Sequence, residues 1–148
     1  MPSFISECVG VNETYGFPSG TPCVAVKLNR IFEFIPDLII NDNVTDNDNA
    51  TASPPYLEIK CEGLHFADKD NIGPIVYFPK AGIDMWHFPF LGQEHYLSPL
   101  VFVKFTNVTR NVLVQVDCRP TNARNIVQKT HSKGSGRVQF ELMVMKKN

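Results

Sequence analysis

Residues 112–118 read Val-Leu-Val-Gln-Val-Asp-Cys, a run in which every second side chain is apolar. Because successive side chains of a β-strand point to opposite faces, these alternate positions share one face. That face carries Val112, Val114, Val116 and Cys118. Gln115 and Asp117 lie on the other face, so the run predicts a half-buried strand whose cysteine points into a hydrophobic core.

Similar short runs, separated by glycine, proline and other turn residues, occur along the chain. They predict strands at Cys23–Phe34 with a break near Asn29, Tyr56–Cys61, Ile75–Phe78, Tyr96–Phe105, Val112–Cys118 and Val138–Met145. Pro99 cannot donate a ladder hydrogen bond, so its strand starts after it, bulges there or lies at an edge. In the last strand, the face expected in the core carries Val138, Phe140, Leu142 and Val144. With one short helix expected around residues 122–128, the pattern is typical of an all-β antiparallel sandwich with long loops and little helix.

Four cysteines, an even number, are consistent with an oxidising compartment and two disulfides. The alternation at 56–61 turns Cys61 inward, as it does Cys118, whereas Cys23 lies opposite the apolar face of its own strand. We therefore predict a Cys61–Cys118 disulfide in the core and a local Cys8–Cys23 disulfide that closes a loop of about 15 residues. A zinc site is the competing interpretation, and it is disfavoured because no two cysteines stand two to four residues apart.

Length and composition fit one folded domain over residues 1–148, since the 148 residues are 43% hydrophobic and 20% charged. The formal net charge of −1 gives no general attraction to nucleic acid, which we do not expect as a partner. The most apolar stretch, residues 31–40, contains two carboxylates and a proline and is shorter than the roughly 20 residues that span a membrane. Residues 1–20 contain no visible signal peptide, so we expect that any export signal was removed or lies upstream.

Asparagine gives a second indication of the compartment. The chain has four Asn-x-Thr acceptor sequences, at Asn12, Asn43, Asn49 and Asn107. Each lies in a stretch that reads as a turn, so we expect glycosylated loops, with polar turn composition without sugar as the alternative. Two of the four lie in the acidic stretch Asp37–Thr51, which we interpret as a solvated loop. A calcium loop is the alternative, although this stretch lacks the glycine and the closing glutamate of an EF-hand.

No motif for catalysis rises above chance, and we expect neither enzyme activity nor a cofactor or metal. The sequence Lys-Gly-Ser-Gly-Arg at 133–137 resembles half of a phosphate loop, but it leads into a strand and reads better as a turn. From Arg119 onward the chain has seven basic residues and one acidic residue. This excess is consistent with a polyanion patch, although a solvated edge is the favoured interpretation.

The most unusual stretch is Met85–Gly92, in which Trp86, Phe88 and Phe90 alternate around Pro89. Because proline interrupts a central strand, this aromatic cluster is expected at an edge or surface, where it could anchor a partner. The alternative is that it caps the core. The residues alone leave both interpretations open.

Several motifs, taken in chain order, resemble the extracellular part of the beta subunit of sodium/potassium-transporting ATPases, a family shared with the gastric proton/potassium pump. They are Cys8 with ETYG at 13–16, GTPC at 20–23, KLNRI at 27–31, DKDNIG at 68–73, YFP at 77–79, YLSPLVFVKF at 96–105, DC at 117–118, NI at 125–126 and GRVQF at 136–140. The resemblance implies an immunoglobulin-like sandwich and the same two disulfides. An antibody-type domain would place a tyrosine two residues before its second core cysteine, where this chain has Val116.

The resemblance also implies a non-catalytic accessory subunit whose partner is the alpha subunit of a P-type ATPase. Such a subunit supports assembly, membrane delivery and stability of the alpha subunit and modulates potassium affinity. The expected location is the extracellular side of the plasma membrane, as a single-pass type II protein whose N-terminal membrane helix is absent from this chain. Cell-surface partners reached through glycans, and an adhesion or junction role without a pump, form the alternative.

In the family, a Tyr-Tyr-Pro-Tyr-Tyr-Gly motif contributes to the alpha contact, and the matching stretch here is His-Phe-Pro-Phe-Leu-Gly at 87–92. The resemblance therefore implies a partner surface formed by this stretch and the neighbouring segment Tyr96–Phe105. The expected partner-binding residues are His87, Phe88, Pro89, Phe90 and Tyr96. The tyrosine hydroxyls of the family motif are missing, so hydrogen bonds from those positions would be lost.

Overall fold

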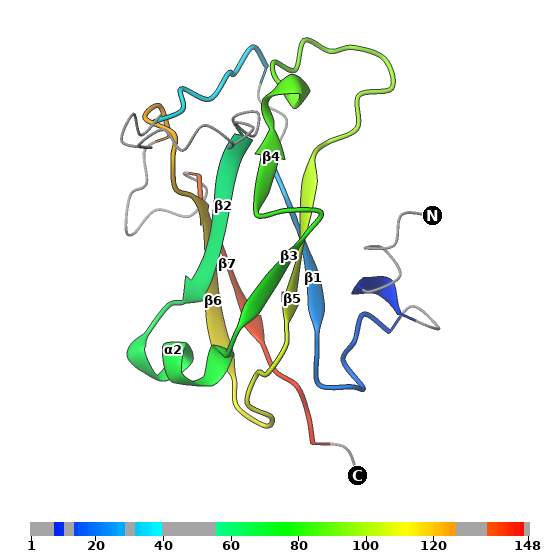
Figure 1. Ribbon diagram of the computed structural model, residues 1–148, viewed down its shortest axis with the longest axis vertical. Coiled ribbons are helices and arrows are strands. Elements are labelled where there is room, and N and C mark those ends of the chain that lie inside the picture. Colours follow the sequence, from blue (N-terminus) through cyan, green and yellow to red (C-terminus); the bar gives the residue numbers. More distant parts are fainter. Residues whose placement is uncertain (1–7, 11–13, 29–31, 40–55, 127–135, 147–148) are drawn as a thin grey trace, which may run out of the picture.

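The computed structural model describes residues 8–10, 14–28, 32–39, 56–126 and 136–146. Two antiparallel sheets form the molecule (Figure 1). The first has the order β1-β5-β3, with β1 at Cys23–Lys27, β5 at Leu100–Phe105 and β3 at Ile75–Phe78. The second has the order β4-β2-β6-β7, with β4 at Gly82–Asp84, β2 at Tyr56–Gly63, β6 at Val114–Pro120 and β7 at Val138–Leu142. The prediction of an all-β sandwich is confirmed.

The hydrophobic core lies between the two sheets and receives alternate side chains from both. The first sheet contributes Val101, Val103 and Phe105 of β5, and the second contributes residues of β2, β4, β6 and β7, among them Leu57, Ile59, Ile83, Val114, Val116 and Leu142. This is the alternation that the sequence shows for 56–61 and 112–118. The predicted inward faces of these two strands are therefore confirmed.

The two disulfides pair as predicted. Cys61 and Cys118 stand directly opposite each other on β2 and β6, with their Cα atoms 4.0 Å apart. This bond therefore joins neighbouring strands of one sheet on its core side and does not cross the core between sheets. Cys8 pairs with Cys23 at the start of β1, and both of these cysteines are buried.

Tyr77 of β3 provides a polar link between the sheets. Its hydroxyl accepts a hydrogen bond of 2.9 Å from the backbone N–H of Cys61, which belongs to β2 in the other sheet. The neighbouring N–H of Ile59 donates to the carbonyl of Ala81 at 2.9 Å. These two hydrogen bonds satisfy backbone N–H groups of β2 beyond the residues that pair with β4, as buried backbone groups require. Burial raises the pKa of the Tyr77 phenol, so the tyrosine stays protonated at neutral pH.

Helix α2 at Phe66–Ile72, the strand β4 and the 3-10 helix η2 at Met85–His87 were not among the elements that the sequence predicted. Asp68 explains the position of α2. One of its carboxylate oxygens accepts the N–H of His65 at 3.0 Å and the other accepts the N–H of Gln115 at 3.1 Å. The first bond caps the start of the helix and the second attaches it to β6.

Several predicted boundaries need correction. The strand predicted at Tyr96–Phe105 begins at Leu100, just after Pro99, because proline cannot join the ladder. The strand predicted to Met145 ends at Leu142, and its first residue, Val138, is 43% exposed. Among the described residues 122–126 there is an isolated bridge and a turn, and no helix.

Asp117 is a further correction, because its predicted position on the polar outer face suggested exposure to water. Its side chain is 3% exposed and forms ion pairs with Arg119 at 3.0 Å and with Arg137 at 3.1 Å. Arg119 also binds Glu62 at 2.6 Å, and this contact lowers the pKa of Glu62 and raises that of Arg119. The outer face of the second sheet therefore carries a charged network across β2, β6 and β7.

Three of the four predicted acceptor asparagines, Asn12, Asn43 and Asn49, lie outside the described residues, as do most of the acidic stretch and the Lys-Gly-Ser part of the 133–137 turn. Within the described part of the chain, no helix is both long and apolar enough to cross a membrane.

Candidate partner-binding surface

The candidate site is the segment between β4 and β5, which contains all five residues expected to bind a partner. It starts with η2 and lies at the end of the sandwich away from α2 and the C-terminus (Figure 1). Its aromatic side chains meet those of residues 32–34, a segment more than fifty positions earlier in the sequence. We refer to residues 32–34 and 86–97 together as the aromatic end.

Phe88 forms the inner part of the aromatic end. Its backbone N–H donates to the carbonyl of Met85 at 3.1 Å and closes the turn of η2. Its ring meets Phe34 edge to face, with centroids 6.2 Å apart, and also packs against the hydrophobic core. This residue therefore fastens the segment to the sandwich, as the core-capping interpretation requires for this position.

Phe90 forms the central part. It pairs with Phe32 in an isolated parallel bridge, and the N–H of Glu33 donates to its carbonyl at 2.9 Å. The Phe90 ring meets Phe32 edge to face at 6.5 Å and lies 4.8 Å from the Tyr96 ring. Phe90 thus links Phe32, from the earlier segment, to Tyr96, from the later part of the loop.

Gln93 braces the loop that follows. Its side-chain oxygen accepts the N–H of Leu91 at 2.6 Å, and its side-chain nitrogen donates to the carbonyl of Pro89 at 3.1 Å. Both bonds are local and close a tight turn around residues 89–93. The loop is therefore held in one conformation by its own polar groups.

His87 stacks on Trp86, with ring centroids 3.7 Å apart. Burial lowers the pKa of His87 from the ordinary value of 6.5, and the negative charge of Asp84 opposes this shift. Asp84 is itself paired with Lys80, a contact that lowers the pKa of Asp84. The imidazole is therefore mainly neutral at pH 7 and serves as an aromatic surface.

The lowered pKa of His87 predicts a pH effect on stability. As the pH falls below about 6.5, the unfolded chain takes up a proton before the folded chain does, so the free energy of unfolding decreases. We expect an NMR titration of the His87 ring to give a pKa below 6.5. His87→Asn should remove this part of the pH dependence, and a measured pKa at or above the ordinary value would contradict the assignment.

The structure brings His87, Phe88, Pro89, Phe90 and Tyr96 into one segment, and it adds two residues that the sequence analysis did not assign to it. Phe32 and Phe34 fall in the last part of a predicted strand, and their alternation was the only signal available. Their contacts with Phe90 and Phe88 depend on the tertiary fold. The role of all these residues in binding a partner stays a prediction.

Asn107 is the one predicted glycan acceptor within the described residues. It is exposed and lies in the connection after β5, where its backbone approaches Gly73 beside α2. The next turn is fixed by the N–H of Thr109, which donates to the carbonyl of Asn71 at 2.9 Å. The connection that carries Asn107 therefore lies next to α2, at the end of the sandwich opposite the aromatic end.

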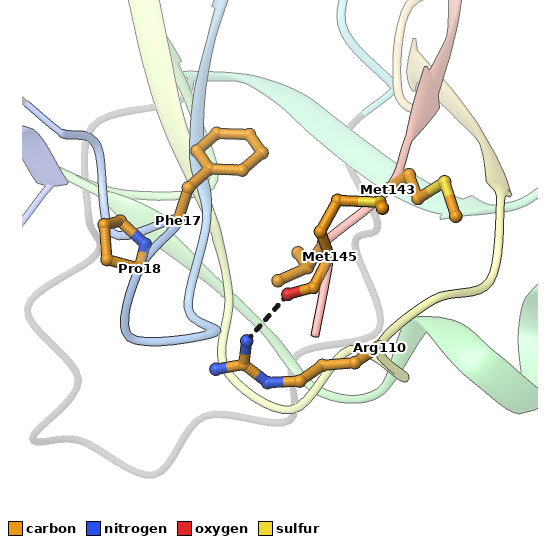
Figure 2. Close-up of a pocket in the computed structure, with 6 residues that line it drawn as sticks. Phe17, Pro18, Arg110, Met143 and Met145 are labelled. Carbon is orange, nitrogen blue, oxygen red and sulfur yellow. Dashed lines mark hydrogen bonds between the residues drawn. The ribbon is translucent and has the colours of Figure 1, made fainter. Parts of the chain in front are cut away.

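A pocket with a volume of about 300 Å³ lies near the C-terminal end of the described chain, and Figure 2 shows the residues that line it. It is lined by Phe17, Pro18, Arg110, Met143, Val144 and Met145. Arg110 donates to the carbonyl of Met145 at 3.0 Å, and the other lining side chains are apolar. The lining contains no paired acid and base and no nucleophile. Nor do the described residues bring together three His, Cys, Asp or Glu side chains that could hold a metal ion.

Comparison with known proteins gives a consistent result. The family described as sodium/potassium ATPase beta chain matches residues 2–140. The chain is 37% identical over 135 residues to a probable sodium/potassium-transporting ATPase subunit beta-3 of Caenorhabditis briggsae, covering 91% of this chain and 41% of that protein. It is 36% identical over 148 residues to the human sodium/potassium-transporting ATPase subunit beta-2, covering 96% of this chain and 46% of that protein.

A more distant relative is the sodium/potassium-transporting ATPase subunit beta-2 of Drosophila melanogaster, which is 31% identical over 153 residues. The match covers 94% of this chain and 46% of the Drosophila protein. The chain thus spans less than half the length of these relatives.

Proposed function

The chain belongs to the sodium/potassium ATPase beta chain family, and we propose that it is the extracellular part of a non-catalytic accessory subunit of a P-type cation-transporting ATPase. The proposed partner is the catalytic alpha subunit. The accessory subunit supports assembly of the alpha subunit, its delivery to the plasma membrane and its stability there, and it modulates potassium affinity. The match to residues 2–140 is the observation that carries this proposal.

One feature of the structure supports an accessory role. The described residues present a braced aromatic surface at one end of the sandwich, a composition typical of protein–protein contacts. The proposed site is therefore an interface, in which Phe88 and Phe90 are the apolar anchors and Pro89 keeps the backbone of the preceding Phe88 extended.

The test is co-expression of the full-length membrane protein with a P-type ATPase alpha subunit in animal cells. We expect the alpha subunit to co-purify with it and to reach the plasma membrane only when both chains are present. The potassium dependence of ATP hydrolysis should change when a different beta subunit replaces this one. Failure of the two chains to co-purify, with normal delivery of the alpha subunit, would contradict the proposal.

One observation favours a second candidate function. The segment 87–92 has no tyrosine, so it lacks hydroxyl groups that could hydrogen bond to an alpha subunit. An adhesion or junction glycoprotein that acts without a pump would not need them. Purification of the full-length protein from intact junctions, followed by mass spectrometry, separates the two functions by the presence or absence of an alpha chain.

The extracellular location predicts a glycan on Asn107. In a eukaryotic secretory host, we expect Asn107→Gln and Thr109→Ala each to remove one glycan, because both disrupt the same Asn-x-Thr acceptor. The measurement is a gel mobility shift that disappears after enzymatic removal of N-glycans. Asn111→Gln is the matched control, since Asn111 is not followed by the acceptor pattern. Equal mobility of wild type and Asn107→Gln would show that this site carries no sugar.

A further inference from the structure

The pocket drawn in Figure 2 lies at the end of the sandwich opposite the aromatic end, where three parts of the chain meet. Phe17 and Pro18 come from the turn before β1, Arg110 comes from the connection between β5 and β6, and Met143, Val144 and Met145 follow β7. Its volume of about 300 Å³ lies at the lower end of the range usual for small-molecule sites, roughly 300–1,000 Å³. The pocket therefore has room for one small ligand.

The two walls of the pocket are fixed by the fold. On one side, the turn that carries Phe17 is closed by the N–H of Gly20, which donates to the carbonyl of Phe17 at 3.1 Å. The Cys8–Cys23 disulfide ties the chain before this turn to β1. On the other side, the N–H of Asn111 donates to the carbonyl of Val144 at 2.8 Å. Because both walls are held within the chain, a ligand does not have to order them when it binds.

Arg110 supplies the charge in the lining. One of its five N–H groups donates to the carbonyl of Met145 at 3.0 Å. Its guanidinium also packs against Gly20, where a Cβ atom would lie 2.5 Å from Nη2, so glycine at this position makes room for the arginine. Unlike Arg119 and Arg137, Arg110 forms no ion pair with the described residues. The pocket thus presents a positive charge that the described chain does not neutralise, beside apolar surface, and this arrangement favours an anionic ligand.

The apolar part of the lining restricts the rest of the ligand. Phe17 and Met143 are each 39% exposed and Met145 is 67% exposed, so they offer apolar surface that a ligand can cover. Methionine side chains are unbranched and adapt to the shape of an apolar partner. The carbonyls of Val144 and Met145 already accept hydrogen bonds from within the chain, which leaves few partners for the backbone of a peptide. The lining therefore favours a hydrocarbon chain with a single polar group over a peptide.

We propose that this pocket binds a medium-chain aliphatic carboxylate, the class of ligand to which free fatty acids belong. The carboxylate accepts hydrogen bonds from the Arg110 guanidinium, whose planar fork matches the two carboxylate oxygens. The hydrocarbon chain lies against Phe17, Met143 and Met145, and the burial of this apolar surface drives binding. Arg110 provides the selectivity for an anion. The site lies at the other end of the sandwich from the proposed contact with the alpha subunit and does not depend on it.

The test is methyl NMR of the disulfide-bonded chain with isotope-labelled methionine, titrated with decanoate below the concentration at which it forms micelles. We expect the methyl signals of Met143 and Met145 to shift and to reach saturation. Met85 is the internal control, because it lies in η2 at the other end of the sandwich and its signal should not move. Decanol and decyltrimethylammonium have the same hydrocarbon chain without a negative charge, so each should bind at least about tenfold more weakly.

Three variants test the role of the guanidinium. Arg110→Gln should weaken decanoate binding by roughly tenfold or more, because it removes a charge-assisted hydrogen bond, and it should change decanol binding little. Arg110→Lys keeps the charge but not the planar fork, so its affinity for decanoate should be intermediate. Arg124→Gln is the matched control, since Arg124 is exposed and does not line the pocket. It should bind decanoate as wild type does.

Several results would overturn the proposal. The Met143 and Met145 signals might stay fixed or shift without saturation, and in either case the pocket holds no aliphatic carboxylate. Equal affinity for decanoate and decanol, or wild-type affinity in folded Arg110→Gln, would show that the guanidinium does not bind the ligand. A shift of Met85 together with Met143 and Met145 would indicate general adsorption to apolar surface. If Arg110→Gln does not fold, the comparison of the three ligands on wild type decides the question alone.

Discussion

Replacing Cys61 and Cys118 together by alanine should lower the free energy of unfolding by about 2–5 kcal/mol, the range found for native disulfides in small secreted domains. The bond closes a loop with a sequence separation of 57 residues. In the chain-entropy model a loop of this length is worth roughly 4 kcal/mol, because the cross-link restricts the unfolded chain. Both cysteines are also buried in the core, so the alanine variant loses packing contacts.

The measurement is urea unfolding of the full chain, with the Cys8→Ala, Cys23→Ala double variant as the comparison. That disulfide spans only 15 residues, for which the same model gives roughly 3 kcal/mol. We therefore expect the Cys61–Cys118 pair to matter more. A larger loss from removing the Cys8–Cys23 pair, or a non-reducing peptide map that joins Cys23 to Cys61 or Cys118, would contradict this account.

Asp117→Ala should lower the free energy of unfolding by about 3 kcal/mol, because removing one member of a buried ion pair leaves the other charge without compensation. The arginine affected most is Arg137, whose side chain is 13% exposed and whose only ion pair among the described residues is with Asp117. Arg119 is less affected because it keeps Glu62 at 2.6 Å. Gln139, which donates to Asp117 at 3.4 Å, also loses its acceptor.

The comparison variants for Asp117 are Asp117→Asn and Glu141→Ala. The asparagine side chain of the first variant keeps a hydrogen-bond acceptor but not the charge, so its loss should be intermediate between wild type and Asp117→Ala. The second variant changes an exposed carboxylate on the neighbouring strand and should stay within about 0.5 kcal/mol of wild type. If Asp117→Ala is no more destabilising than Glu141→Ala in urea unfolding, the network on β2, β6 and β7 contributes little to the fold.

The sequence was most informative where a local alternation sets the buried face. Strands β2 and β6 show this alternation of apolar and polar residues over several positions. The alternation turns Cys61 and Cys118 toward the same core, so these two cysteines could be paired correctly from the sequence. Pro99 marked the start of β5 for a similarly local reason, since proline lacks a backbone N–H.

The rest depends on contacts between distant residues. Asp117 alternates with the buried positions of its own strand, and nothing near it in the sequence indicates that Arg137, just before β7, lies beside it. The seven-residue helix α2 is too short for a helical period to stand out, and the Asp68 contact with Gln115 that holds it spans 47 positions. At the aromatic end, Phe32 reaches Phe90 only through the tertiary fold.

The place of the Cys61–Cys118 bond also determines how the molecule responds to mechanical tension. A force applied to the two ends of the chain cannot lengthen the segment between these cysteines, whose separation is 57 residues. A fully extended chain of that length would reach roughly 190–200 Å. The stretched protein cannot gain this length until the disulfide is reduced. Phe90 lies inside the closed segment and its partner Phe32 lies outside it. Tension on the chain can therefore separate Phe32 from Phe90 while Phe90 itself stays within a covalently closed ring.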